Sequence, residues 1–241
     1  MRTRGANQPR AFHFPVCCGI VLTLLAASAG PARGGTINFD VNAESNTLTA
    51  PRLFSNATHL SEIYASWGVH FAGPAGNDGG AILVDISTNN GGWGGWARSS
   101  PNVLAFTAPS SPRDLSDGGH ASGPETIRFD SAMKTVTLWA TGDNANTTFE
   151  LAAFDGNGIA LDSDTESITV RNWVSLSVSS DAGIRSVVFT LKATDNPWTG
   201  YLVDDLSYTP DLLHASPRTR DVHVAGPCDN GVAGAATGEQ A

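Results

Sequence analysis

The 241-residue sequence predicts an all-β fold, an antiparallel β-sandwich, and three observations lead to this prediction. Apolar and polar residues alternate over short runs such as 135–139, 148–151 and 166–170, as in strands with one buried and one wet face. Turn sequences separate the runs, and Asp-Gly-Asn-Gly at 155–158 is a strong hairpin signal because these residues tolerate positive φ. No long segment repeats with the 3.6-residue period of a helix.

One domain is expected between residues 36 and 210, which is long enough to bury a single core. About ten or eleven strands are expected in it, at 37–41, 68–71, 81–86, 103–107, 126–129, 135–139, 148–151, 166–170, 174–178, 185–192 and 201–208. The one helical candidate is 59–67, with Gly68 as its C-terminal cap. Residues 211–241 lack sustained periodicity, and this tail is predicted to be disordered.

The first 29 residues resemble a signal peptide. Arginines precede an apolar run at 16–27, and Ala27-Ser28-Ala29 offers the small-x-small pattern that signal peptidase cuts. A single membrane anchor is the alternative, but the run is shorter than the roughly 18 apolar residues of a spanning helix. The expected protein is therefore secreted, extracellular or at the cell surface, with no membrane span in the mature chain.

The mature chain is strongly acidic. From Gly34 onward ten basic and twenty-three acidic residues remain, which gives a net charge of −13. Lys134 and Lys192 are the only lysines, so nucleic acid is not an expected partner, because phosphate binding needs clustered Lys and Arg. Cys17 and Cys18 leave with the leader and Cys228 remains alone, so the fold has to depend on its core and not on an internal disulfide.

Two adjacent acids interrupt the last expected strand, in the sequence Gly-Tyr-Leu-Val-Asp-Asp-Leu-Ser-Tyr at 200–208. With a period of two, Asp204 shares a face with Leu206 and Tyr208, so it points inward if they do. An inward carboxylate needs a partner. A cation such as calcium is one alternative; hydrogen bonds from backbone N–H groups, or solvation at a sheet edge, are the others.

The order of short motifs resembles a known family. The motifs that show this resemblance are Ile-Asn-Phe-Asp at 37–40, Gly-Val-His-Phe at 68–71, Ile-Arg-Phe at 127–129, Leu-Ala-Ala-Phe-Asp-Gly-Asn-Gly at 151–158, Ile-Arg-Ser-Val-Val-Phe at 184–189 and Val-Asp-Asp-Leu-Ser-Tyr at 203–208. These are similar to exported bacterial jelly-roll domains that often carry a PEP-CTERM sorting tail and are related in fold to carbohydrate-binding modules. The tail here has neither a Pro-Glu-Pro motif nor an apolar helix followed by basic residues.

The resemblance implies a jelly-roll sandwich whose first and last strands are neighbours. In such domains a structural calcium often bridges acids from both strands. Carried over to this sequence, that picture makes Asp40 and Asp204 the expected calcium ligands.

Two glycine- and asparagine-rich segments carry tryptophans that the expected strands do not bury. Trp93 and Trp96 lie in Asn-Asn-Gly-Gly-Trp-Gly-Gly-Trp, and Trp198 lies in Asp-Asn-Pro-Trp-Thr-Gly. Exposed indole faces stack on sugar rings, so these three are the candidate ligand-binding residues. The alternative is that they fold back as lids over the ends of the sandwich. Trp67, Trp139 and Trp173 lie in patterned segments and are expected in or near the core.

Catalysis is not expected. Neither Gly-x-Ser-x-Gly nor His-Glu-x-x-His occurs, and the scattered His59, His70 and His120 have no zinc-site spacing. One catalytic alternative stays open, namely a glycosidase that uses two carboxylates from distant strands. The sequence therefore favours a secreted, non-catalytic module that binds an extracellular glycan or matrix, with a structural calcium. The alternative is a structural or surface-associated protein with no small-molecule ligand.

Overall fold

A computed structural model describes residues 33–51, 60, 62–73, 80–84, 97–99, 101–107, 123–142, 145–197 and 199–213. The strands are β1 (Gly35–Ile37), β2 (Val69–Ala72), β3 (Ala81–Val84), β4 (Asn102–Thr107), β5 (Glu125–Gly142), β6 (Thr147–Phe154), β7 (Ala160–Ile168), β8 (Val174–Thr194) and β9 (Gly200–Pro210). The expected signal peptide and residues 214–241 of the expected tail lie outside the described residues.

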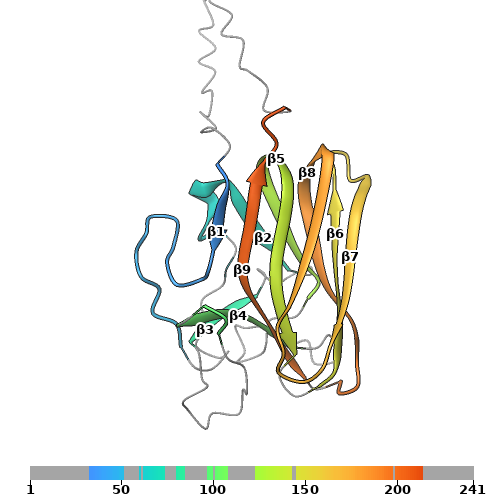
Figure 1. Cartoon of the computed structure of the whole chain (residues 1–241). Helices are drawn as coiled ribbons and strands as arrows, with labels where there is room; N and C mark the ends of the chain where they lie inside the picture. The colour runs from blue at the N-terminus through green and yellow to red at the C-terminus, as the bar shows by residue number, and fades with distance from the viewer. Residues whose placement is uncertain are drawn as a thin grey trace, which may run out of the picture. The chain divides into compact units, whose positions relative to one another are not determined.

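All strand pairs are antiparallel, in the order β3-β4-β9-β5-β8-β6-β7, with β1 paired to β9 and β2 paired to β5 (Figure 1). The predicted antiparallel all-β sandwich is confirmed. So is the predicted contact between the first and last strands, because Ile37 pairs with Leu206 and Gly35 with Tyr208. The first strand ends earlier than expected, since Phe39 has a φ of 63° and turns the chain away from β9.

The long strands β5 and β8 serve both layers of the sandwich. The second half of β5 pairs with β9, while its first half pairs with β2 and with the second half of β8. Register shifts between Arg128 and Thr135 let β5 bend, and β8 has Gly183 with a φ of 81° near the same level. One continuous sheet can therefore fold over a single core.

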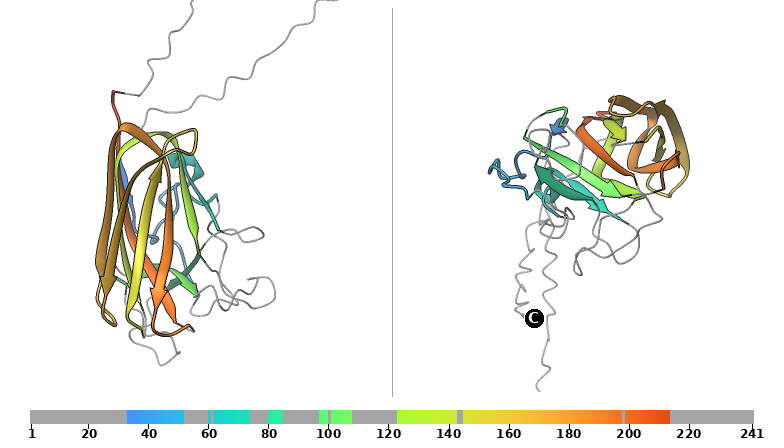
Figure 2. Two further views of the ribbon diagram at one scale, coloured as in Figure 1. Left: turned by 90° about the vertical axis from the view of Figure 1, so that its right-hand side faces the viewer. Right: turned by 90° about the horizontal axis from the view of Figure 1, so that it is seen from below.

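The β6–β7 hairpin comes back toward β8 (Figure 2). Asp155 shapes its turn by accepting hydrogen bonds from the backbone N–H groups of Asn157 and Ile159, both at 2.8 Å. Further along, the carboxylates of Asp162 and Asp164 accept hydrogen bonds from the backbone N–H groups of Ser179 and Ser177 of β8, also at 2.8 Å. The β6 strand pairs with β8 only from Ser186 onward. The two aspartates therefore provide acceptors for N–H groups in the earlier part of β8.

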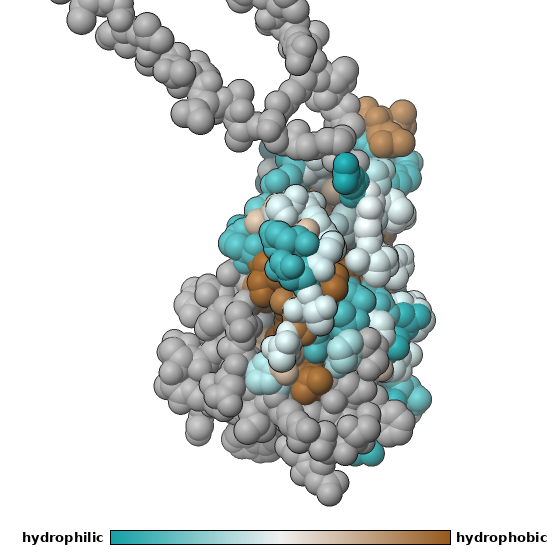
Figure 3. All heavy atoms as spheres, turned by 90° about the vertical axis from the view of Figure 1, so that its left-hand side faces the viewer, coloured by the Kyte–Doolittle hydropathy of each residue, from teal (hydrophilic) through white to brown (hydrophobic). Residues whose placement is uncertain are grey.

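The main core is continuous and rich in aromatic side chains. Toward the start of β9, Tyr201 stacks on Phe106 with ring centroids 5.0 Å apart and contacts Phe149 and Phe189. A separate apolar cluster lies on the opposite face of β3, β4 and β9 and comprises Ala81, Leu83, Val103, Ala105 and Leu202. On the side seen in Figure 3, the described residues are mostly polar, with apolar atoms in a few patches between them.

The helical candidate at 59–67 is reduced to a single 3-10 turn, η2 (Ala65–Trp67). Gly68 ends it in the left-handed conformation with a φ of 74°, and its N–H donates to the carbonyl of Ala65 at 2.8 Å. The capping prediction is confirmed, while a regular helix is not formed in the described part of this segment.

Candidate functional site

A β-bulge in β9 separates Asp204 from the residues with which it was expected to share a face. Asp205 has a φ of 47°, and the pairing with β5 shifts so that Trp139 opposes Asp204 while Thr137 opposes Ser207. The extra residue reverses the alternation of side chains. Asp204 therefore faces the same side as Leu202 of the separate apolar cluster, whereas Leu206 and Tyr208 face the main core. The predicted shared face was wrong for this reason.

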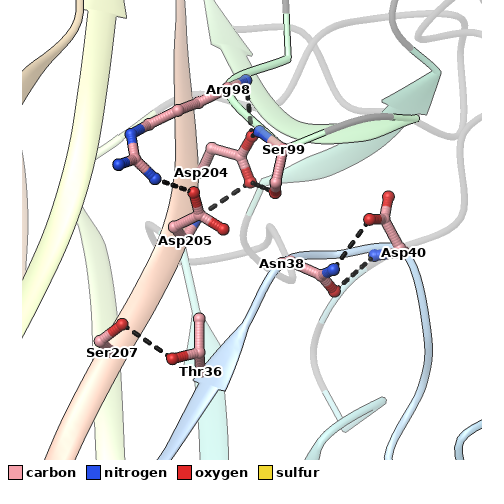
Figure 4. Close-up of polar contacts among 8 residues, drawn as sticks. All are labelled: Thr36, Asn38, Asp40, Arg98, Ser99, Asp204, Asp205 and Ser207. Atoms are coloured by element: carbon pink, nitrogen blue, oxygen red, sulfur yellow. Dashed lines mark hydrogen bonds and ion pairs between the residues drawn. The ribbon is translucent and has the colours of Figure 1, made fainter.

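Asp204 is fully buried and accepts four hydrogen bonds. Its Oδ2 accepts from the backbone N–H groups of Arg98 and Ser99, both at 2.8 Å. Its Oδ1 accepts from the hydroxyl of Ser99 at 3.0 Å and from the backbone N–H of Asp205 at 2.8 Å (Figure 4). The backbone hydrogen bonds of the alternative interpretation are thus present, and the carboxylate holds residues 98–99 against β9.

Asp205 engages the same segment through a side chain. The guanidinium of Arg98 forms an ion pair with Asp205 and lies 3.9 Å from the ring centroid of Trp139. A guanidinium over an indole adds a cation–π attraction to the ion pair. The two acids therefore bind different parts of the same segment. Asp204 accepts hydrogen bonds from the backbone of residues 98–99, and Asp205 holds the Arg98 side chain against β5.

Asp40 lies near this cluster but uses other partners. Its Oδ1 accepts from the backbone N–H of Asn102 at 2.9 Å, and its Oδ2 accepts from the amide of Asn38 at 2.8 Å. Figure 4 shows Asp40 turned to Asn38 while Asp204 points to Ser99. Burial raises the pKa of Asp40, the Asn102 N–H opposes this, and the nearby charge of Asp205 adds to it.

The carboxyl group of Asp204 has a raised pKa of about 7. Burial is the largest cause; the Ser99 N–H works in the opposite direction, and the negative charge of Asp205 raises the pKa further. The ionised form is therefore costly at this position even with four donors around it.

The contacts of Asp204 do not fit a calcium ligand. A carboxylate offers about four acceptor positions, and four protein donors already use them. Within the described ranges, no three side chains of His, Cys, Asp or Glu are placed so that they could share a metal ion. Calcium binding through Asp40 and Asp204 stays a prediction, and the hydrogen bonds favour its alternative.

A hydroxyl-lined face, which sequence reasoning did not single out, lies on the outside of β1, β9, β5 and β8. One row runs across Thr36, Ser207, Thr137 and Ser177, and a second across Thr209, Thr135 and Ser179. Neighbouring hydroxyls pair at 2.9 Å (Thr36 and Ser207), 2.7 Å (Thr137 and Ser177) and 2.6 Å (Thr135 and Thr209). Trp139 continues the same face of β5 beside these rows, because β5 alternates regularly from Thr135 to Trp139.

The predicted ligand-binding residues Trp93, Trp96 and Trp198 lie outside the described residues. Of the three tryptophans expected in or near the core, Trp67 packs against the main core and Trp173 against the separate apolar cluster. Trp139 is half-buried, on the outer face, under Arg98.

Sequence reasoning also missed Glu125, Arg98 and Ser99. The burial of Glu125 could have been predicted, because positions 125, 127 and 129 share one face of a strand and the other two residues, Ile127 and Phe129, are apolar. For Arg98 and Ser99 no local signal exists, because their partner lies more than a hundred residues away.

No protein-family model matches the chain, and no curated protein matches it either. Solved structures with a similar fold include the K2 cleaved adhesin domain of Lys-gingipain, with a TM-score of 0.40 and 14% identity over 66% of this chain and 97% of that one. The CBM22-1 xylan-binding domain of Paenibacillus barcinonensis Xyn10C has a TM-score of 0.36 and 14% identity over 76% and 97%. TmCBM61 in complex with β-1,4-galactotriose has a TM-score of 0.37 and 11% identity over 72% and 99%. These likenesses concern the fold and assign no ligand to this chain.

The described part of the chain contains no helix that is both long and apolar enough to cross a bilayer.

Proposed function

We propose that this protein is an exported, non-catalytic β-sandwich module that binds an extracellular glycan or matrix polysaccharide. The observation that carries the proposal is the hydroxyl-lined face of β1, β9, β5 and β8, which continues into Trp139 and the Arg98–Asp205 pair. The predicted aromatic residues Trp93, Trp96 and Trp198 belong to the same proposal as additional stacking surfaces. The predicted signal peptide and the resemblance to exported bacterial jelly-roll domains support export by a bacterium.

The chemistry of this face suits a neutral polysaccharide. Threonine and serine hydroxyls both donate and accept hydrogen bonds, as sugar hydroxyls do. The charge of Arg98 is balanced by Asp205, and the carboxylates of Asp164 and Asp162 border the rows at Ser177 and Ser179, so the face does not attract an anionic polysaccharide. A half-buried indole supplies apolar contact area, and its neighbours supply polar groups.

The environment of the acids supports the non-catalytic part of the proposal. Glycoside hydrolysis needs two carboxyl groups that flank the scissile bond and are free to exchange protons. Asp204 is buried under four donors, and Asp205 is held by Arg98. Both are committed to holding the protein together.

Binding of soluble polysaccharides, measured by affinity electrophoresis and calorimetry, tests the proposal. Thr137→Val removes one hydroxyl from the face while keeping the shape and β-branching of the side chain. It should weaken binding severalfold, and Trp93→Ala or Trp96→Ala should cost about 1–3 kcal/mol, the scale of one aromatic contact.

The matched control is Thr148→Val. Thr148 forms the same kind of hydroxyl pair, at 2.8 Å with Ser167, but on β6 and β7. Equal losses of polysaccharide affinity in Thr137→Val and Thr148→Val would show that the hydroxyl-lined face does not bind the ligand. The same would follow if affinity changed in parallel with thermal stability across all the variants.

A second candidate function is a structural or surface-associated protein without a small-molecule ligand. The observation that favours it is that hydroxyls of the face already bond to each other, at 2.6–2.9 Å. Such pairs stabilise a sheet without any ligand. Absence of binding to every glycan in a broad array, by a folded mature protein, would support this candidate over the first.

Calcium is the remaining predicted component. Its predicted ligands are Asp40 and Asp204, and the hydrogen bonds that both carboxyl groups accept favour the competing explanation, in which no cation is bound. Melting in calcium and in chelator separates the two.

A further inference from the structure

Glu125, the first residue of β5, is a buried acid to which the described residues give no well-formed hydrogen bond. Its side chain is 1% exposed and faces the core side of the strand, opposite Phe189 of β8. No described N–H or O–H group meets either carboxyl oxygen in hydrogen-bonding geometry. In this respect Glu125 differs from every other acid discussed above.

The groups that face Glu125 carry no charge at neutral pH. From β9 comes Tyr201, whose hydroxyl accepts a hydrogen bond from the Gly123 N–H at 2.9 Å. From β8 comes Phe189, and the backbone N–H groups of Ala72 and Gly80 lie nearby. Among the described groups there is thus no cation to compensate a negative charge on Glu125.

An unpaired carboxylate is far more costly in an apolar interior than the neutral acid. Burial raises the pKa of Glu125 to about 8, and the nearby N–H groups of Gly80 and Ala72 oppose this without cancelling it. The proton that the acid would release in water at neutral pH therefore stays on the carboxyl group in the folded protein.

We propose that Glu125 is a pH-sensitive lock: protonated, it allows β2, β5 and β9 to close over it, and when it loses its proton to alkaline solvent it opens that end of the sandwich. The lock goes beyond the proposed binding function, since it regulates the fold and involves none of the ligand-binding residues named above.

The direction of the effect follows from proton linkage. The folded protein holds the proton more tightly than the unfolded chain, in which a glutamate has a pKa of about 4.5. The stabilisation is fully present below that value and is lost as the pH rises through about 8. Within this window the folding equilibrium constant should fall by about tenfold per pH unit from this residue.

Urea unfolding of the mature protein between pH 5 and pH 9.5 tests the lock. Wild type should lose stability steeply up to about pH 8, and Glu125→Gln, which is neutral at every pH, should reduce the slope between pH 5 and pH 8. The slope that remains below about pH 7 is expected from Asp204, whose pKa is also raised. Glu44→Gln is the matched control, because Glu44 is exposed. This variant should show the same dependence of unfolding stability on pH as the wild type. Parallel curves for wild type and Glu125→Gln would overturn the proposal.

A second measurement does not depend on how well the variant folds. The carboxyl ¹³C resonance of Glu125 in the wild-type protein, assigned by its loss in Glu125→Gln or by through-bond correlation, should titrate with a midpoint above pH 7. A midpoint below pH 5 would show an ionised Glu125 in the folded state and would also overturn the proposal. Neither result bears on glycan binding, so the two proposals fail separately.

Discussion

Asp204 and Glu125 are buried to the same degree, at 0% and 1% exposure, but the protein accommodates them in opposite ways. Asp204 is surrounded by four donors from residues 98–99 and from Asp205, whereas none of the described donors meets Glu125 in hydrogen-bonding geometry. The comparison shows two solutions to the cost of a buried acid. One supplies hydrogen bonds that make the carboxyl group a structural anchor, although burial still raises the pKa of Asp204 to about 7, and the other relies on the proton alone.

The largest expected effect comes from removing the anchor. Asp204→Ala leaves three part-buried backbone N–H groups and the Ser99 hydroxyl without their acceptor, so the free energy of unfolding should fall by about 3–5 kcal/mol. Denaturant unfolding measures it. Asp195→Ala is the control, since Asp195 also accepts hydrogen bonds, from Asn146, but is exposed, and its loss should stay within about 1 kcal/mol. Equal losses would mean that Asp204 is not an anchor.

A sharper comparison replaces each acid by its amide at pH 8. Asp204→Asn should destabilise by about 2 kcal/mol net, because the new NH₂ group points a donor at other donors, and this loss outweighs the gain from removing an acid whose pKa is raised to about 7. Glu125→Gln should stabilise by about 2 kcal/mol at the same pH, because the variant has no proton to lose. Opposite signs in one set of unfolding curves are the expected result, and shifts of the same sign would contradict the distinction between the two acids.

A smaller pH effect is expected at the surface, from His70. Its Nδ1 lies 2.8 Å from Glu62 and its Nε2 lies 3.1 Å from Asp130, and only the imidazolium can donate to both. Burial lowers the pKa of His70, but its two carboxylate partners outweigh burial and raise it above 6.5 overall. Arg128 of β5 lies opposite His70 in the strand pair.

His70→Gln should therefore cost about 0.5–1 kcal/mol at pH 5.5 and little at pH 8.5, since stability from a raised histidine pKa is lost as the pH rises. The partial exposure of all three side chains keeps the effect small. Unfolding curves at the two pH values measure it. A loss that does not change with pH would assign His70 a packing role.

The sequence allowed the fold to be predicted where local pattern decides it. Alternating runs located most strands, Asp-Gly-Asn-Gly located the β6–β7 turn, and Gly68 marked the end of the η2 turn. The pairing of β1 with β9 was available from the order of motifs. These features depend on neighbours in the sequence, or on a topology that many sandwiches share.

The site was less predictable, because one residue in a left-handed conformation changed the side that Asp204 faces. Strict alternation placed Asp204 in the main core, and the bulge at Asp205 moved it to the other face. A hint was present, since aspartate tolerates positive φ better than most residues. The donors from residues 98–99 come from a distant segment, and no short-range pattern could have revealed them.

The central claim is that Asp204 is held by hydrogen bonds from the protein and not by a cation. Melting of wild type and Asp204→Asn, each in calcium and in chelator, tests this most directly. The account predicts that wild type melts at the same temperature in both solutions and that Asp204→Asn melts lower by the same amount in each. A wild-type melting temperature that falls in chelator and recovers with calcium, together with no such response in Asp204→Asn, would contradict the account and establish Asp204 as a calcium ligand.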